Sequence, residues 1–414
     1  MLFALIMIVI LYIVKEGFEY WVDYLNLKHM KGRAHEVPTE FIGHIDRELL
    51  AKTQQYVIEN TTFGFISAIF NNIMLIIFIF GGLLNIFNLW IVSLNQSFIV
   101  SGLVFFIILS FIETVLGMPF DFYRTFKIES KFGFNTMTVK LWVIDLIKGL
   151  ILSGIIMSIV ISAALWLISV SHDWWLWLWL FFFLFSILIM YVSPYIIEPL
   201  FNKFTPIEEE SLVGDIKNLM AKAGISVSKV FKMDASKRSK HTNAYFTGIG
   251  RTKRIVLFDT LLAKMNTSEI LAVLAHEAGH WKKRHIIKRI VLYEVLSFIV
   301  LYVSHLVLES EVLPYIFMIE QSTFYTKFVL FGFVASIVVF PLAPIFNAYS
   351  QKHEREADRF ACTITGDNKS LISSLIKLSK DNLSNLHPHP LYVKFHYSHP
   401  PVTERVRYIS ENFR

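Results

Sequence analysis

The sequence has 414 residues, of which 54% are apolar and 17% are charged, and its formal net charge is +6. Soluble domains are about 45–50% apolar and roughly 25% charged, so this composition excludes an ordinary soluble protein and indicates contact with the lipid bilayer. The single cysteine, Cys362, excludes an internal disulfide framework and a cysteine-rich zinc cluster. Because the basic residues flank long apolar blocks, the positive charge does not indicate a nucleic-acid partner.

The apolar blocks predict seven membrane-spanning helices. Six blocks are long enough to cross about 30 Å of hydrocarbon at 1.5 Å per residue. They are residues 63–90, 93–112 (extending to about Gly117), 149–170, 174–197, 290–308 and 328–349. A seventh block, residues 2–14, reaches this length if it continues through Lys15 into the aromatic residues that follow. It lacks the basic start and the small-residue cleavage site of a signal peptide, so we expect an uncleaved anchor.

The basic residues orient these spans. The segments between them carry 6, 0, 5, 0, 17 and 1 lysine and arginine residues in chain order, and the C-terminal tail carries 10. Positive residues collect on the cytoplasmic side of a membrane, and a wrong number of spans would break this alternation. We therefore expect an N-terminus outside, with the C-terminus and the large loop after the fifth span in the cytoplasm.

The large loop, residues 201–289, has the pattern of a small α+β domain. Its predicted elements are a helix at 208–224 that ends at Gly224, strands around 243–248 and 254–260 joined by a turn at 250–253, and a helix that begins near Asn266 with capping-box spacing to Glu269. Alternation of apolar residues supports the strands, and a helical apolar stripe supports both helices.

The last of these helices carries a His-Glu-x-x-His pattern. His276 and His280 are four residues apart, so on a helix both imidazoles project from one face and can bind one Zn²⁺. Glu277 can then act as general base toward a zinc-bound water, which is the chemistry of peptide-bond hydrolysis. Gly279 in mid-helix costs about 1 kcal/mol relative to alanine, which predicts a requirement for close packing or access at this position.

A catalytic zinc needs a third protein ligand, and the best candidate lies after the last span. Glu354 and Asp358 share a helical face, so one can bind the metal while the other orients a ligand histidine. We assign Glu354 as the ligand and Asp358 as its supporting acid. His353 and Glu356 are rival ligands, but neither has an acid four residues later.

These observations predict a mostly α membrane protein with a small cytoplasmic α+β zinc-metalloprotease domain. We divide it into spans one to five with their loops (residues 1–200), the catalytic insert (201–289), spans six and seven (290–350) and a C-terminal cytoplasmic segment with the third zinc ligand (351–414).

With these residues assembled, the sequence resembles the type I CAAX prenyl proteases, a family of membrane zinc metalloendopeptidases. The resemblance includes the run Pro-Phe-Asp-Phe-Tyr-Arg-Thr-Phe at 119–126 and the run Glu-Pro-Leu-Phe-Asn that begins at Glu198. The other matching segments are 128–129, 132–135, 243–245, 254–262, 276–281, 354–358 and 396–401. The matches occur in order over about 70% of the chain, so together they are far more specific than the zinc motif alone.

The resemblance implies an α-barrel of seven spans around a large water-filled chamber, with one zinc per chain at its cytoplasmic end. It also implies that Asn243 holds the substrate peptide and that His399 polarises the scissile carbonyl. An amide suits an extended backbone and an imidazole suits an oxyanion, so both roles are chemically reasonable. The expected substrate is a peptide or a membrane-associated protein, and its prenylation stays open. We expect a monomer.

The sequence departs from eukaryotic members of that family in a short loop between the last two spans and in its C-terminal residues 411–414. We therefore favour a bacterial cell membrane, with the endoplasmic reticulum membrane as the location if the protein is eukaryotic. Two alternatives differ in function. One is a quality-control protease like the related HtpX group, which has fewer spans. The other is a transporter or scaffold that retains a zinc site without hydrolysing peptides.

Overall fold

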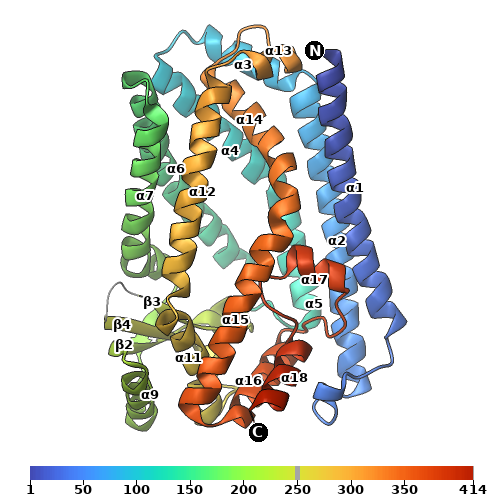
Figure 1. The fold of residues 1–414 in the computed structure, drawn as a ribbon, viewed down its shortest axis with the longest axis vertical. Coiled ribbons are helices and arrows are strands. Elements are labelled where there is room, and N and C mark those ends of the chain that lie inside the picture. The colour runs from blue at the N-terminus through green and yellow to red at the C-terminus, as the bar shows by residue number, and fades with distance from the viewer. Residues whose placement is uncertain (248–251, 414) are drawn as a thin grey trace.

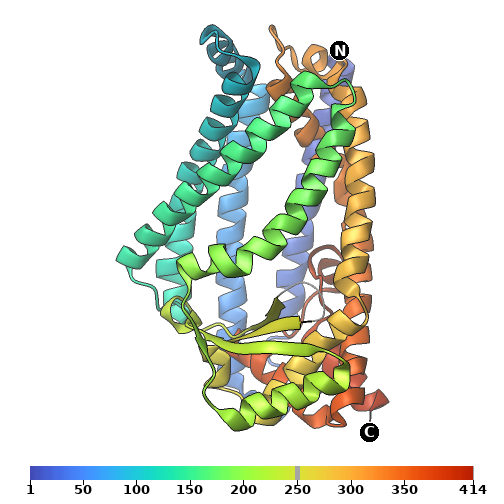
Figure 2. The ribbon, with the colours of Figure 1, turned by 90° about the vertical axis from the view of Figure 1, so that its left-hand side faces the viewer.

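The computed structural model describes residues 1–247 and 252–413. Long helices run along the length of the molecule, and a small sheet with several shorter helices lies at one end, close to the C-terminus (Figures 1 and 2). The N-terminus lies at the opposite end. In the described residues, six helical segments are long and apolar enough to cross a membrane: Arg47–Phe80, Phe98–Phe132, Val139–Val170, Trp174–Phe201, His285–Leu308 and Phe324–Thr365.

The boundaries of the predicted spans at residues 63–90 and 93–112 are wrong. The block 63–90 is not one helix, because α2 (Arg47–Phe80) ends at a pair of glycines and α3 (Leu83–Ser93) begins after them. Gly82 has φ = +81°, a left-handed conformation that glycine adopts without strain and that ends an α-helix. The next helix, α4 (Phe98–Tyr123), begins later than predicted since Ser97 caps it by accepting a hydrogen bond from the backbone N–H of Val100.

The first block forms α1 (Leu2–Gly32), a helix much longer than the apolar run itself. Its 31 residues extend about 46 Å at 1.5 Å per residue, and it runs beside α2 (Figure 1). Asn72 of α2 joins the two helices: it accepts a hydrogen bond from Tyr12 at 2.9 Å and donates one to Glu16 at 2.7 Å. These partly buried polar contacts explain how a helix with charged residues in its middle packs among apolar neighbours.

The remaining long helices are α6 (Val139–Val170), α7 (Trp174–Val192), α12 (His285–Leu308), α14 (Phe324–Val339) and α15 (Ala343–Thr365). The last two are separated by one turn of 3₁₀-helix at Phe340–Leu342. The helical segment therefore continues well past the predicted end of the last span at residue 349. This continuation matters because it carries Glu354 from the membrane-spanning part to the end of the molecule that holds the sheet (Figure 1).

The sheet has four strands in the order β1-β2-β4-β3. They are β1 (Phe204–Pro206), β2 (Ser226–Met233), β3 (Ala244–Thr247) and β4 (Thr252–Phe258). The predicted pair is present as antiparallel β3 and β4, with Ala244 opposite Leu257; the predicted turn at 250–253 begins outside the described residues. Strands β1 and β2 were not predicted from the sequence, and the pairing of β2 with β4 shifts register between Val227 and Lys229. Such a bulge interrupts the alternation by which a strand is recognised.

Helices cover this sheet and complete the soluble end of the molecule. The predicted helix at 208–224 is α9 (Glu210–Ala223), which ends at Gly224 with φ = +74° and buries the predicted apolar face. Three further helices follow, α16 (Asn368–Asp381), α17 (Pro390–His396) and α18 (Val402–Asn412). Helices α9, α11 (Thr267–Lys282), α16 and α18 enclose one apolar core that extends from the sheet to the C-terminal helix. Helix α17 packs against α1 and α15 instead.

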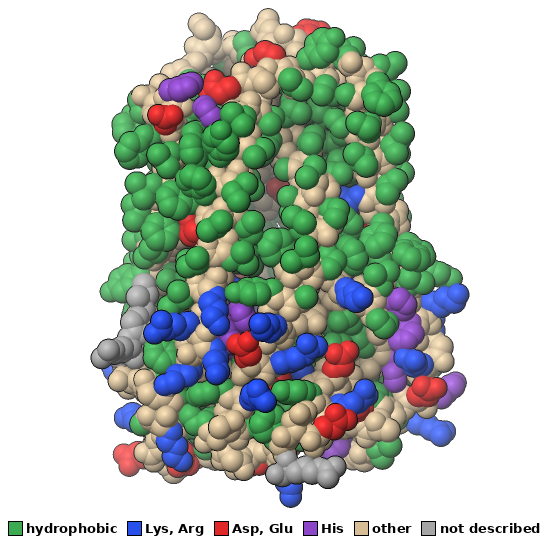
Figure 3. All heavy atoms as spheres, viewed as in Figure 1, with side chains coloured by type: hydrophobic (Ala, Val, Ile, Leu, Met, Phe, Trp, Pro, Cys, Tyr) green, Lys and Arg blue, Asp and Glu red, His purple; other side chains and the backbone are tan. Residues whose placement is uncertain are grey.

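The surface divides along the long axis. Apolar side chains cover the part that the long helices build, whereas most of the charged side chains in this view gather at the end that holds the sheet (Figure 3). A monomeric soluble protein rarely exposes so large an apolar surface. The division is the one expected of a protein whose helices contact lipid and whose small domain contacts water.

Candidate metal centre

Helix α11 presents the His-Glu-x-x-His segment. The predicted capping box is confirmed: Asn266 accepts from the backbone N–H of Glu269 at 2.9 Å, and the Glu269 carboxylate accepts from the backbone N–H of Asn266 at 2.9 Å. The same carboxylate accepts from Ser373 at 2.6 Å and from Lys377 at 2.7 Å. The first turn of α11 is therefore joined to α16, which fixes the helix before the two histidines are reached.

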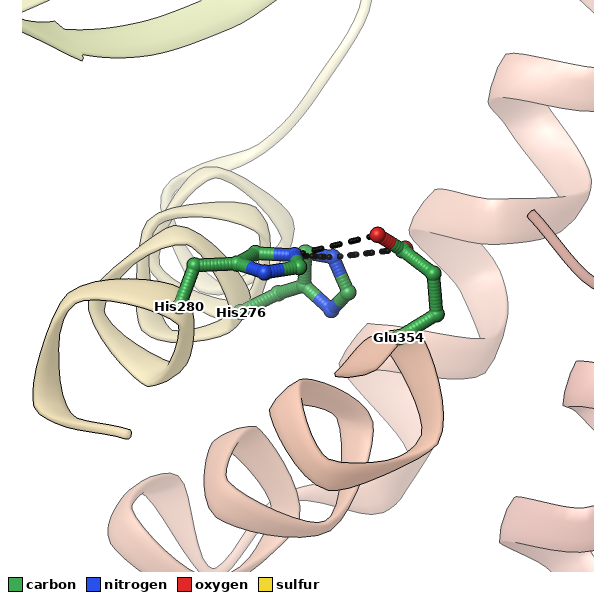
Figure 4. Close-up of side chains that lie close together, drawn as sticks. All are labelled: His276, His280 and Glu354. Atoms are coloured by element: carbon green, nitrogen blue, oxygen red, sulfur yellow. Dashed lines mark hydrogen bonds and ion pairs between the residues drawn. The ribbon is translucent and has the colours of Figure 1, made fainter. Parts of the chain in front are cut away.

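The structure brings His276, His280 and Glu354 together although the glutamate lies on a different helix (Figure 4). The two histidine Nε2 atoms are 3.2 Å apart. One Glu354 oxygen lies 3.3 Å from Nε2 of His276, and the other lies 3.2 Å from Nε2 of His280. Glu354 Oε2 is buried and has no hydrogen-bond partner. A buried carboxylate oxygen without a hydrogen-bond partner, 3.3 Å from an imidazole nitrogen, is costly unless a cation lies beside both atoms.

The spacing of these atoms fits a metal ion. Tetrahedral zinc with bonds of about 2.0–2.2 Å separates its ligand atoms by about 3.3–3.6 Å, close to the observed values. Nitrogen and carboxylate oxygen donors also suit zinc chemically. The rival ligands His353 and Glu356 lie elsewhere, since both side chains contact His285 instead.

Asp358 lies against the first histidine. Its Oδ1 is 2.8 Å from Nδ1 of His276, and Arg405 donates two hydrogen bonds to the same carboxylate at 2.6 and 2.9 Å. Burial by itself lowers the pKa of His276, but the carboxylates of Asp358 and Glu354 beside it outweigh burial and raise this pKa to about 9. The surroundings thus favour positive charge on or beside His276, as a site for a cation requires.

Gly279 allows α11 to approach α15. A Cβ at this position would lie 3.0 Å from Cα and 3.1 Å from the carbonyl oxygen of Ala357. The predicted packing requirement is therefore confirmed. Since Ala357 lies between Glu354 and Asp358 in the sequence, this close approach also sets the distance between the histidines and the glutamate.

We expect Gly279→Val to lower the free energy of unfolding by about 2–3 kcal/mol, because the extra carbons overpack the contact between α11 and α15. The bound metal should decrease as well, since the two helices separate. The matched control is Gly214→Val on α9, where no atom lies within 4 Å of the added Cβ; its stability should change by no more than about 0.5 kcal/mol. Thermal unfolding and metal analysis of both variants measure this, and equal stability would contradict the packing argument.

A cavity of about 480 Å³ opens over the three residues, and Asn243, Glu277 and His399 also line it. His399 Nε2 lies 3.4 Å from Oε1 of Glu354, and its side chain is 62% exposed. The side chain of Asn243 accepts from the backbone N–H of Ala244 at 2.8 Å, and Asn243 directly precedes β3, the strand at the edge of the sheet. The cavity is therefore lined by the three candidate ligands and by Glu277, and it lies next to the open edge of β3.

Two residues of the centre were missed by the sequence analysis. Arg405 holds Asp358 in place, and His285 forms a hydrogen bond with His280. Arg405 lies 129 positions from His276 in the sequence, so no local spacing relates the two. His285 lies five positions after His280, which on a continuous helix is the wrong face.

Long apolar helices joined to a buried site of two histidines and a carboxylate define this protein as a multi-pass membrane metalloprotease. Comparison with known proteins identifies the family. Residues 26–203 match the family model described as the CAAX prenyl protease N-terminal, with five membrane helices, and residues 206–412 match peptidase family M48. The chain belongs to the CAAX prenyl protease family.

Relatives over nearly the whole length support this assignment. The chain is 34% identical to CAAX prenyl protease 1 of Saccharomyces cerevisiae over 95% of this chain and 93% of that protein. It is 34% identical to the Arabidopsis thaliana homolog over 95% and 94% of the two chains, and 31% identical to the human homolog over 90% and 88%. The crystal structure of S. mikatae Ste24p matches with a TM-score of 0.90 and 32% identity, covering 98% of both chains.

Proposed function

We propose that the protein is a zinc endopeptidase in which His276, His280 and Glu354 hold one Zn²⁺ per chain. The distances of 3.2–3.3 Å among the two histidine Nε2 atoms and the two oxygens of Glu354 support this proposal most strongly. When bound, zinc lowers the pKa of a water molecule and polarises a carbonyl group. Asp358 orients His276 by contacting the Nδ1 atom of the histidine, and Arg405 in turn orients Asp358. The ring of the first ligand is therefore fixed on the side away from the metal.

Glu277 is the proposed general base. It follows the first proposed ligand on α11 and lines the same cavity, which supports this role. It accepts a proton from the water that attacks the peptide bond and returns it to the leaving amine. His399, at the rim of the cavity, donates a hydrogen bond to the carbonyl oxygen as negative charge develops on it.

The substrate is a peptide or a protein, and we propose that it binds as an additional strand beside β3. In the described part of the chain no strand pairs with the outer edge of β3, and an exposed edge offers unpaired backbone groups to an extended peptide. Asn243 at the start of this edge places one more hydrogen-bonding group beside the metal centre. This arrangement directs the substrate backbone across the site.

The proposed specificity is for peptides that carry a prenyl group, and one pair of peptides tests it. A peptide should be compared with and without a farnesyl group on its cysteine, in the same detergent. Burial of only two methylene groups contributes about 1.6 kcal/mol, so we expect kcat/KM to be at least tenfold higher for the farnesylated peptide. Equal values would instead favour a quality-control protease without prenyl recognition. Bound zinc with no cleavage of any peptide would favour the non-enzymatic alternative.

We further propose seven spans, with α1 as the first, an N-terminus outside and a cytoplasmic C-terminus. The placement of the two termini at opposite ends of the molecule supports an odd number of crossings (Figure 1), and the alternation of basic segments supports the direction. The four-part division of the chain and the chamber between the spans belong to the same proposal. The relatives named above are eukaryotic, so they do not favour the bacterial membrane, which stays a prediction, as does a monomer.

Cysteine labelling tests this orientation. In a background where Cys362, the single cysteine, is replaced by serine, a cysteine is introduced at Gln96 or at Glu208. Both positions are exposed; Gln96 lies between α3 and α4, and Glu208 lies in the soluble insert. We expect a membrane-impermeant maleimide to label Gln96→Cys in intact cells and Glu208→Cys only after the membrane is opened. The reverse pattern would invert the proposed topology.

A further inference from the structure

His285, at the start of α12, connects the second histidine to an acid on another helix. Its side chain is fully buried, with 0% exposed. Its Nδ1 lies 3.1 Å from Nδ1 of His280, and its Nε2 lies 3.0 Å from Oε2 of Glu356. His280 therefore has an outer partner just as His276 has Asp358, but here a second imidazole lies between the ligand and the carboxylate.

The two ends of the hydrogen-bonded series Glu356–His285–His280 determine where its protons lie. The Glu356 carboxylate only accepts hydrogen bonds, so His285 must donate from Nε2. Neutral His285 then has an unprotonated Nδ1, which accepts from Nδ1–H of His280. That leaves Nε2 of His280 without a proton, and this is the atom that faces Glu354 and His276. Each hydrogen bond thus prepares His280 as a metal ligand.

The backbone between the helices makes this contact possible. On a continuous helix His285 would lie about 140° around the axis from His280. Instead α11 ends at Lys282, and Arg284 adopts the left-handed conformation with φ = +56°. This turn directs α12 so that His285 faces back toward the metal centre. A non-glycine residue in this conformation is uncommon, so the packing around it must favour the bend.

The ring of His285 is also held on its face. The ring of His353 stacks on the ring of His285, with centroids 4.0 Å apart and planes inclined by 9°. Tyr349 in turn packs against the ring of His353. The stack prevents the rotation that would break the hydrogen bonds at either end. His353, a rival metal ligand in the sequence analysis, thus lies beside the ring of His285 and supports it.

We propose that Glu356 and His285 act as a positioning pair that orients His280 and makes it a stronger zinc ligand. This inference rests on the proposed metal site. Outer partners of this kind fix the tautomer of a ligand histidine and raise its basicity, and their loss typically weakens metal binding about 10–100-fold. Neither residue contacts the substrate in this role, so both are positioning residues.

Zinc affinity of the purified full-length protein, measured by competition with a chelator, tests the proposal. His285→Leu should weaken zinc binding about 10–100-fold. His285→Asn keeps an acceptor near the position of Nδ1, so it should restore most of the affinity. His285→Gln places its amide near the position of Nε2 and leaves His280 without an acceptor, so it should not. A purely structural role predicts no such difference between two amides of similar stability, and thermal unfolding verifies that stability.

Two further measurements distinguish a failure of the proposed positioning pair from a failure of the proposed metal site. Glu356→Gln preserves the shape of a side chain that is 33% exposed. It should weaken zinc binding by about tenfold, the lower end of the range for such partners, and Glu208→Gln on the surface is its control. Cobalt substituted for zinc should show an altered visible spectrum in His285→Leu, because His280 is no longer held. Zinc binding as tight as wild type in His285→Leu, His285→Gln and Glu356→Gln would overturn the positioning pair. A wild-type protein that binds no zinc would overturn the metal site itself.

Discussion

Glu277→Gln should lower kcat by about 10²–10⁴-fold while the protein retains about one zinc per chain. General acid–base groups contribute rate factors of this size, and an amide neither accepts a proton from water nor returns one to the leaving amine. The substitution is nearly isosteric, and Glu277 is not among the three residues whose ligand atoms converge. Metal binding should therefore persist while the chemical step fails.

The measurement is the turnover of one peptide by purified protein, with zinc content determined on the same sample. Glu208→Gln, an equivalent change at an exposed position in the soluble insert, is the control and should keep wild-type kcat. Activity of Glu277→Gln at the wild-type level would reject Glu277 as the base. Loss of zinc together with activity would instead indicate that Glu277 supports the metal site.

The second large effect concerns the third ligand. Glu354→Ala should weaken zinc binding about 10²–10³-fold and abolish hydrolysis. Zinc binding at structural sites amounts to about 10–16 kcal/mol, or about 3 kcal/mol for each of four ligands, and such a loss corresponds to this factor. The side chain of Glu354 is only 5% exposed, and its two oxygens face the two histidines. Water cannot easily replace it, and two imidazoles alone bind zinc weakly.

Ligand-linked stability measures this loss independently of activity. A ligand present at about 1,000 times its dissociation constant stabilises the folded state by about 4 kcal/mol. Added zinc should therefore raise the melting temperature of the metal-stripped wild-type protein. The melting temperature of metal-stripped Glu354→Ala should hardly change when zinc is added. The neighbouring exposed residue provides the control, because Arg355→Ala on the same helix should respond to zinc as wild type does. A normal response of Glu354→Ala would remove Glu354 from the ligand set.

Much of the fold follows from local patterns. Uncharged apolar runs of sufficient length predicted where membrane helices occur, because lipid admits only segments whose backbone groups are paired internally. The capping box at Asn266 begins α11 where predicted, and the left-handed Gly224 ends α9 where predicted. Boundaries were less predictable: hydropathy is averaged over many residues, whereas the break at Gly82 depends on a single backbone conformation.

The two histidines of the candidate metal centre were predictable from the sequence alone, since a spacing of four positions on one helix places two imidazoles on one face whatever surrounds them. Glu354 was predicted as the third ligand from its spacing to Asp358, but only the packing of the helices brings it next to the two histidines. Glu354 lies beside the histidines because Gly279 lets α15 approach α11. Arg405 is placed there by α18, and His285 is placed there by the left-handed turn at Arg284. Contacts between distant segments depend on how whole helices pack, and neither residue spacing nor composition encodes that packing locally.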